Sequence, residues 1–203
     1  MSDFTDLANA EEPTVGIASS PAFFTVSIFK LGLMYIVTFG LYGPYWLYQN
    51  WRVYKQYSGS PIWPLPRTVF ATIYLPCLFY KIDETFKAQG RGAMPYWAAY
   101  AFLLMLISIS PLVIGFFIGL YQALTNGSPQ LGPLLIIILS TVPLMLQSLV
   151  LCRVQSFINT LNENVDGSDN SSFSVWNWLW MAIGVVCWWT WMYASLNPEY
   201  VRL

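Results

Sequence analysis

The stretch TFGLYGPYWLYQNWRVYK, residues 38–55, marks the place where a hydrophobic segment gives way to aromatic and then to basic residues. Apolar side chains dominate residues 31–41, and tyrosines and tryptophans follow them. Tyr and Trp rings gather at the headgroup level of a bilayer, and here Arg52 and Lys55 come directly after the rings. The pattern is typical of a transmembrane helix that leaves the membrane, so it predicts a span over about 31–50.

The composition also predicts a membrane protein. Of the 203 residues, 56% are hydrophobic, 18% are aromatic and only 9% are charged, whereas about 25% of a typical soluble domain is charged. The net charge of −1 excludes the basic face that a nucleic-acid partner needs. The chain has no histidine, the commonest metal ligand and general base. We therefore expect the lipid bilayer as a partner, with no nucleic acid, no cofactor and no metal.

Further hydrophobic segments predict spans over about 96–122, 131–152 and 174–196. Each is long enough, at about 1.5 Å per residue, to cross a hydrocarbon core of about 30 Å. The apolar run 68–80 is shorter and contains Pro76, which is typical of an interfacial or re-entrant segment. The prediction is an all-α, polytopic membrane helix bundle with about four transmembrane helices plus this short segment, in a single domain over 22–203.

Two stretches predict helical pieces on the cytoplasmic side, 81–91 and 153–165. In the second, apolar residues recur at helical spacing, so the helix should continue beyond the bilayer. We expect its apolar stripe to cover the 68–80 run. Residues 1–21 contain four carboxylates and no Lys or Arg, which predicts a disordered acidic tail that remains in the mature chain.

The distribution of basic residues predicts an orientation. Of nine Lys and Arg residues, six lie in 52–91 and another is Arg153. Basic residues are enriched in cytoplasmic loops, so loops 51–94 and 153–173 should be cytoplasmic. Four crossings then leave both termini outside. In the alternative, the 68–80 run also crosses and the N-terminus turns inward.

Several short motifs carry a resemblance to a known group of proteins. They are Val26-Ser27, Lys30-Leu31, TFGLY at 38–42, YWLYQNWR at 45–52, Arg67-x-x-Phe70 and SVWNW at 174–178. Together they resemble uncharacterised bacterial inner-membrane proteins of unknown function that share a T-x-G-x-Y-x-x-Y-W-x-Y-x-N-W signature. The resemblance implies a multi-pass protein of the bacterial inner (cytoplasmic) membrane, and it brings no catalytic residue.

The candidate interface or signature residues follow from these motifs and from the polar residues inside the spans. They are Lys30, Thr38, Gly40, Tyr42, Tyr45, Trp46, Tyr48, Asn50, Trp51, Arg52, Arg67, Gln147, Trp176 and Trp178. Gln147 lies near the middle of its span, where an interhelical hydrogen bond is the ordinary role of such a residue.

Three functions compete at this point. All ten carboxylates lie in tails or loops, whereas transporters and pumps usually keep a charge inside the bundle. We therefore expect a non-enzymatic accessory or assembly subunit that packs, through aromatic helix faces, against a membrane protein partner or a second copy. The alternative is a small channel or transporter, with Pro111, Pro143 and Gln147 along a polar path. A lipid-modifying enzyme comes third and would need a cluster of Asp83, Glu84, Lys87 or Arg91.

Overall fold

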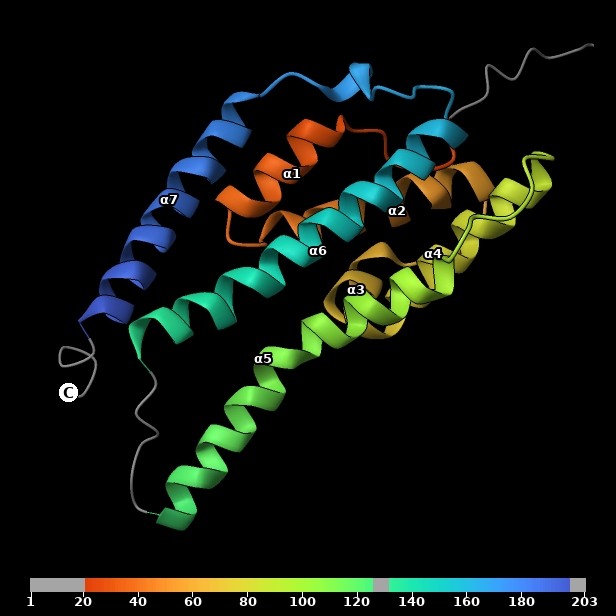
Figure 1. Ribbon diagram of the computed structural model, residues 1–203. Helices are drawn as coiled ribbons and strands as arrows, with labels where there is room; N and C mark the ends of the chain where they lie inside the picture. Colours follow the sequence, from red (N-terminus) through yellow and green to blue (C-terminus); the bar gives the residue numbers. More distant parts are fainter. Residues whose placement is uncertain (1–20, 126–131, 198–203) are drawn as a thin grey trace, which may run out of the picture.

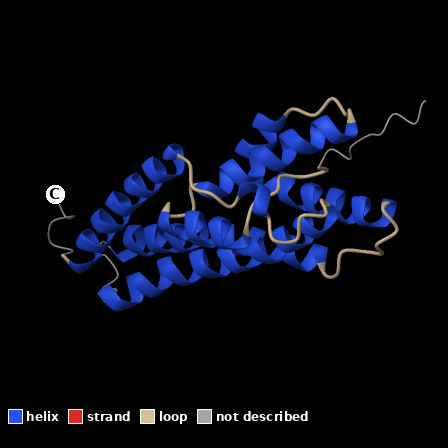
Figure 2. Cartoon of the chain, turned by 90° about the horizontal axis from the view of Figure 1, so that it is seen from above, coloured by secondary structure: helices blue, strands red, loops and turns tan. Residues whose placement is uncertain are grey.

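The computed structural model describes residues 21–125 and 132–197, and every regular element in these ranges is a helix (Figures 1 and 2). The elements are α1 (Ile28–Val37), α2 (Tyr42–Ser58), α3 (Pro64–Val69), α4 (Ala71–Ala88), α5 (Trp97–Thr125), α6 (Pro133–Leu161), the short 3-10 helix η1 (Ser168–Asn170) and α7 (Val175–Leu196). The predicted all-α helical class is confirmed. Apart from Pro21, the predicted acidic tail lies outside the described residues.

Three helices in the described part of the chain are long and apolar enough to cross a membrane, namely α5, α6 and α7. The predicted spans at 96–122, 131–152 and 174–196 fall on these three helices. Helix α6 contacts both of the others, whereas α5 and α7 do not contact each other. Figure 1 shows α5 and α7 on opposite sides of α6. The three helices therefore form a row, and only 17% of the most apolar stretch of each is buried.

The single helix predicted over about 31–50 does not form. Helix α1 ends at Val37, and the chain reverses before α2 begins at Tyr42. In the turn, Phe39 and Gly40 have φ angles of 56° and 83°. Glycine adopts this left-handed conformation without steric cost, which stops the helix. The prediction failed because the same run of apolar and aromatic residues suits a helical hairpin as well as one continuous span.

The two ends of this α1–α2 hairpin meet. The Phe24 N–H donates to Asn50 Oδ1 at 3.3 Å, and the rings of Phe23 and Tyr54 stack with their centroids 5.2 Å apart. Phe24 and Asn50 are 26 positions apart, and a straight helix of that length would separate them by about 39 Å. The hairpin therefore begins and ends at one end of the molecule.

We call the end of the molecule where the hairpin begins and ends the loop end. It also carries the α4–α5 and α6–α7 connections, because Arg91 pairs with Glu163 at 3.0 Å and the Ala22 N–H donates to Asn162 Oδ1 at 3.0 Å. Residues 21–27, 89–96 and 162–174 thus lie together, away from the far ends of α5, α6 and α7. Figure 1 shows the far ends of these three helices at the bottom left of the molecule.

Helix α4 joins two pieces that the sequence predicted separately, the apolar run 68–80 and the polar piece 81–91. With α3 it exposes a group of large apolar side chains: Trp63, Leu65, Val69, Phe70 and Ile73. An exposed apolar surface followed by a charged helical half is the pattern expected of an interfacial segment. The prediction of a short interfacial or re-entrant element agrees with this arrangement.

Helix α6 continues past residue 152 to Leu161, as its apolar spacing predicted. Leu78 and Phe79 of the 68–80 run, the expected cover for its apolar stripe, belong to the same buried cluster as Val154 and Ile158, and the stripe also has other partners. Val154 and Ile158 are fully buried where α6 packs on α1 and on the extended residues 22–27. Phe157 instead contacts Phe86 of α4, with ring centroids 6.0 Å apart.

Candidate functional site

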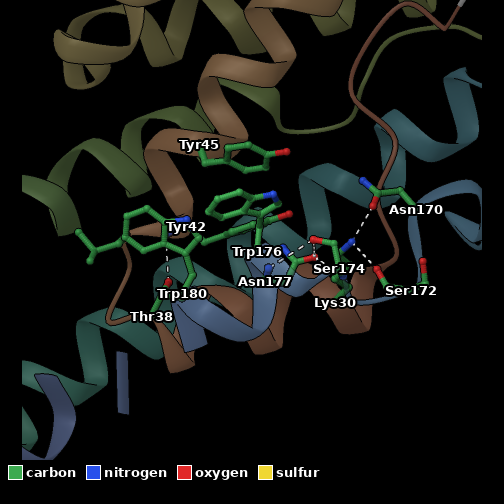
Figure 3. A pocket seen from close by; sticks show the side chains of 11 residues that line it. Lys30, Thr38, Tyr42, Tyr45, Asn170, Ser172, Ser174, Trp176, Asn177 and Trp180 are labelled. Atoms are coloured by element: carbon green, nitrogen blue, oxygen red, sulfur yellow. Dashed lines mark hydrogen bonds between the residues drawn. The ribbon is translucent and has the colours of Figure 1, made fainter. Parts of the chain in front are cut away.

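A cavity of about 460 Å³ lies between the α1–α2 hairpin and the start of α7. We call it the hairpin cavity (Figure 3). It is lined by Lys30, Thr38, Leu41, Tyr42, Tyr45, Asn170, Ser172, Ser174, Trp176, Asn177 and Trp180. Five of the sequence-predicted residues are therefore brought together here: Lys30, Thr38, Tyr42, Tyr45 and Trp176.

Lys30 supplies the positive charge of the cavity. The residue is only 4% exposed, and its Nζ donates to Asn170 Oδ1 and to the Ser172 carbonyl oxygen, both at 2.7 Å. The Phe173 ring lies 5.8 Å from Nζ. Within the described ranges no carboxylate pairs with this ammonium. A buried charge normally has a charged partner, because two neutral oxygens offset only part of its lost hydration.

The start of α7 forms the polar floor of the cavity. Ser174 is the N-cap: its Oγ accepts from the Asn177 N–H at 3.3 Å, and Asn177 Oδ1 accepts from the Ser174 N–H at 3.0 Å. This reciprocal capping box fixes the direction in which α7 leaves the loop end. The N-terminal end of a helix carries a partial positive charge, so it adds to the charge of Lys30.

Aromatic rings form the opposite side. The rings of Tyr42 and Tyr45 have centroids 5.1 Å apart, and Trp176 and Trp180 line the cavity from α7. Figure 3 shows these four rings on one side and Lys30 with its two oxygen partners on the other. Tyr45 and Trp180 are 45% and 49% exposed, so the aromatic side is open to the surroundings. The cavity is thus amphipathic.

The position of Lys30 depends on the extended residues 22–27 that precede α1. Five amide side chains bond the backbone of this segment, and we call them the amide cradle: Asn50, Gln155, Asn159, Asn162 and Asn170. An extended segment outside a sheet has no backbone ladder, so its buried N–H and C=O groups need side-chain partners. The cradle therefore holds the start of α1 against α6 and the 162–174 connection.

Asn162 makes the largest contribution to the cradle. Its Oδ1 accepts from the Ala22 N–H at 3.0 Å, and its Nδ2 donates to the Phe23 carbonyl at 2.6 Å and to Thr25 Oγ1 at 2.8 Å. The sequence indicated Asn50 as a signature residue, but it placed Gln155, Asn159 and Asn162 only on the polar side of an amphipathic helix. Their long-range role requires the hairpin and has no local signal.

Other signature residues hold α2 in place rather than line the cavity. Trp46 Nε1 donates to Gln155 Oε1 at 2.6 Å, and Asn50 Nδ2 donates to the Trp46 carbonyl at 2.8 Å. Trp51 is fully buried, and the Arg67 guanidinium lies 4.4 Å from the centroid of its ring. Gly40 forms the hairpin turn. Three predicted residues lie outside these groups: Tyr48, Arg52 and Trp178.

Gln147 lies apart from the hairpin cavity. Its Oε1 accepts from the Tyr35 hydroxyl at 2.5 Å, and its Nε2 donates to Ser108 Oγ at 3.4 Å. These bonds connect α6 to α1 and α5, the ordinary role of a glutamine inside a helix bundle. A second cavity, of about 220 Å³, lies beside it. Neither Pro111 nor Pro143 lines that cavity.

The acidic residues considered for catalysis have contacts within the fold. Asp83 is 1% exposed, accepts from the Met94 N–H at 2.8 Å and pairs with Lys87 at 2.6 Å. Glu84 pairs with Lys81, also at 2.6 Å. Across 21–125 and 132–197, no three His, Cys, Asp or Glu side chains lie close enough together to hold a metal ion.

Comparison of the chain with protein-family models, curated proteins and solved structures finds no match. The function therefore has to be argued from geometry. Sequence reasoning missed the polar side of the hairpin cavity, supplied by Asn170, Ser172 and Asn177, because no local pattern brings these residues next to Lys30. It also missed Gly115 and Gly119 on α5, although their spacing of four residues is a local signal.

Proposed function

We propose that this protein is a non-enzymatic accessory or assembly subunit of a bacterial inner membrane, and that it packs against a transmembrane helix of a partner protein. The observation that carries the proposal is the row formed by α5, α6 and α7. A self-sufficient bundle buries the facing sides of its helices, whereas each helix here buries only 17% of its most apolar stretch. A partner helix would complete the row.

The second half of α5 offers the packing face. Gly115 and Gly119 lie four residues apart on one side of the helix, and a Cβ added at either position would meet no atom within 4 Å. Small residues at this spacing let two helix backbones approach closely in a membrane. Phe116, which is 66% exposed, flanks them. We call Gly115, Phe116 and Gly119 the glycine face.

The charges support an orientation for this row. Eight of the nine Lys and Arg residues are in the described ranges; all precede α5, apart from Arg153 in the part of α6 near the loop end. The positive-inside rule then assigns the loop end, with loops 51–94 and 153–173, to the cytoplasm. Because the hairpin returns to this end, residues 21–27 are also cytoplasmic in the proposal. In this proposal α5, α6 and α7 are the crossings.

Site-specific photo-crosslinking tests the glycine face. A benzophenone amino acid at Phe116 should give one adduct of defined mass in intact cells, and the same probe at Val186 on α7 should not give that adduct. Adding Gly115→Leu should abolish the Phe116 adduct without lowering the thermal stability of the isolated chain, since an added Cβ meets no atom of that chain. A missing adduct would overturn the proposal. An adduct with the mass of two copies of the chain would show that the glycine face binds a second copy and not a foreign protein.

A small channel or transporter is the second candidate, favoured by the cavity beside Gln147. Uptake of labelled solutes by proteoliposomes, compared with the Gln147→Leu variant, tests this function. Transport that the variant loses would favour it over the accessory function. Equal background uptake by both proteins would exclude a path that depends on this amide.

A further inference from the structure

The hairpin cavity contains a buried positive charge that no carboxylate of the described part of the chain pairs with. Lys30 is 4% exposed and has two neutral acceptors, the Asn170 amide and the Ser172 carbonyl. An ammonium group carries three N–H donors, so one remains after these two bonds. Charge-assisted hydrogen bonds to an anion are about twice as strong as those to neutral groups. An anion in the cavity would therefore supply the charged partner that Lys30 lacks within residues 21–125 and 132–197.

Backbone groups at the start of α7 add further donors. The capping box uses the N–H groups of Ser174 and Asn177, while those of Val175 and Trp176 have no acceptor among the residues that the structure describes. N–H groups of a first helical turn bind phosphate and carboxylate groups readily. Trp176 and Lys30 both line the hairpin cavity, so the first turn of α7 lies at the same cavity as the Lys30 ammonium.

The surroundings indicate the kind of anion. The cavity lies where α7 leaves the loop end, and Trp176, Trp178 and Trp180 are all exposed there. Tryptophans in such positions mark the headgroup level of a bilayer. Aromatic rings line one side of the cavity, and Lys30 with its oxygen partners lies on the other. An amphiphile with an acidic head and an apolar body would match both sides, whereas a small inorganic anion would leave the aromatic side unused.

We propose that the hairpin cavity is a binding site for the phosphate-bearing headgroup of an anionic phospholipid. The phosphate accepts from Lys30 Nζ and from the first turn of α7. The glycerol and first acyl carbons lie against Tyr42, Tyr45 and Trp180. A volume of about 460 Å³ holds such a headgroup and falls within the usual 300–1,000 Å³ of ligand pockets. The inference goes beyond the proposed function, because it concerns α1, α2 and α7 rather than the glycine face.

Native mass spectrometry of the full chain in a mild detergent tests the site. The probes are phosphatidylglycerol, the zwitterionic phosphatidylcholine, and inorganic phosphate. We expect one phosphatidylglycerol to be retained and to raise the unfolding temperature. Phosphatidylcholine should be retained less, because its choline cation would lie near the like charge of Lys30. Lys30→Met should reduce phosphatidylglycerol binding at least about tenfold, as loss of a charge-assisted hydrogen bond implies. Lys55→Met, which removes an exposed charge from α2, is the matched control.

A second variant covers the case in which Lys30→Met does not fold. Tyr45→Ala removes a 45% exposed ring from the aromatic wall and leaves Lys30 with its partners, so it should fold and still weaken phosphatidylglycerol binding. Unchanged binding in both variants would overturn the site. Inorganic phosphate that stabilises the protein as well as phosphatidylglycerol would overturn the lipid as the ligand. None of these outcomes affects the crosslink from Phe116, so the lipid site and the proposed function are tested separately.

Discussion

At the scale of single residues, long-range hydrogen bonds from amide side chains organise the loop end. Asn162 bonds residues about 140 positions away in the chain, and Gln155 bonds both Trp46 Nε1 and the Phe24 carbonyl. Each amide offers a donor and an acceptor, so one side chain satisfies two backbone groups of an extended segment. The amide cradle thereby sets the position of Ser27, the N-cap of α1, and of Lys30 three residues later.

Asn162→Ala should destabilise the protein by about 2 kcal/mol, because it leaves partly buried backbone groups of residues 22–23 without partners. Thermal unfolding in detergent, followed by near-UV circular dichroism, measures the change. Asn164→Ala is the control, since within the described residues the Asn164 side chain bonds only Ser168, four positions away. An equal loss in both variants would contradict the special role of Asn162.

Arg67→Lys should lower stability by about 1 kcal/mol although the charge is kept. The guanidinium lies 4.4 Å from the Trp51 ring centroid and 5.2 Å from that of Tyr74. A planar guanidinium stacks on two aromatic rings in a way that an ammonium cannot. The same unfolding assay checks this, with Arg52→Lys at an exposed position as the control. A lysine variant as stable as wild type would show that charge alone matters at residue 67.

At the scale of elements, α7 is locked against the hairpin rather than merely adjacent to it. Trp188 Nε1 donates to the Ile36 carbonyl at 2.9 Å, and its ring lies 4.8 Å from that of Phe39. Between these contacts Gly184 faces the end of α1 so closely that a Cβ there would lie 2.1 Å from the Val37 carbonyl oxygen. The backbones of α1 and α7 therefore touch directly.

Gly184→Ala should cost at least about 2 kcal/mol, because α7 has to move away from the end of α1. Gly115→Ala on α5 is the matched control: it meets no atom, and replacement of a helical glycine by alanine should add about 0.5–1 kcal/mol. Unfolding temperatures of the two isolated variants should thus move in opposite directions. A Gly184→Ala protein as stable as the Gly115→Ala protein would refute the close α1–α7 contact.

At the scale of the whole molecule, a polar loop end is joined to an open row of three apolar helices. Salt bridges and amide bonds concentrate at the loop end, whereas the far halves of α5 and α6 expose most of their large apolar side chains. The division matches a protein that is structured at one membrane surface and surrounded by lipid or partner helices below it.

Cysteine labelling tests this arrangement. In a background without Cys77, Cys152 and Cys187, single cysteines at Pro21, Ser58 and Gly132 should react with a membrane-impermeant maleimide. The first two should label from the cytoplasmic side, in inverted vesicles, and Gly132 should label in spheroplasts. A single crossing over 31–50 requires Pro21 and Ser58 to label from opposite sides. That result would overturn the hairpin and restore four crossings.

The sequence alone determined the features that depend on hydropathy, helical spacing and charge over short stretches of the chain. Hydropathy predicted the α5, α6 and α7 spans, helical spacing predicted that α6 continues beyond residue 152, and charge predicted which loops share one side. Each of these depends on neighbours within a few turns of helix, so no tertiary contact is needed to recognise it. The motifs and spans also contain five residues, Lys30 among them, that line the hairpin cavity.

Only the tertiary structure decided that residues 28–58 reverse instead of forming one continuous helix. The aromatic and basic residues after Leu41 suit the end of a span and the return arm of a hairpin equally well. The choice depends on the left-handed Gly40 and on bonds from residues 22–27 to Asn50 and Asn162. The hairpin cavity exists only after that reversal, because its two sides come from segments about 140 positions apart, such as Lys30 and Asn170.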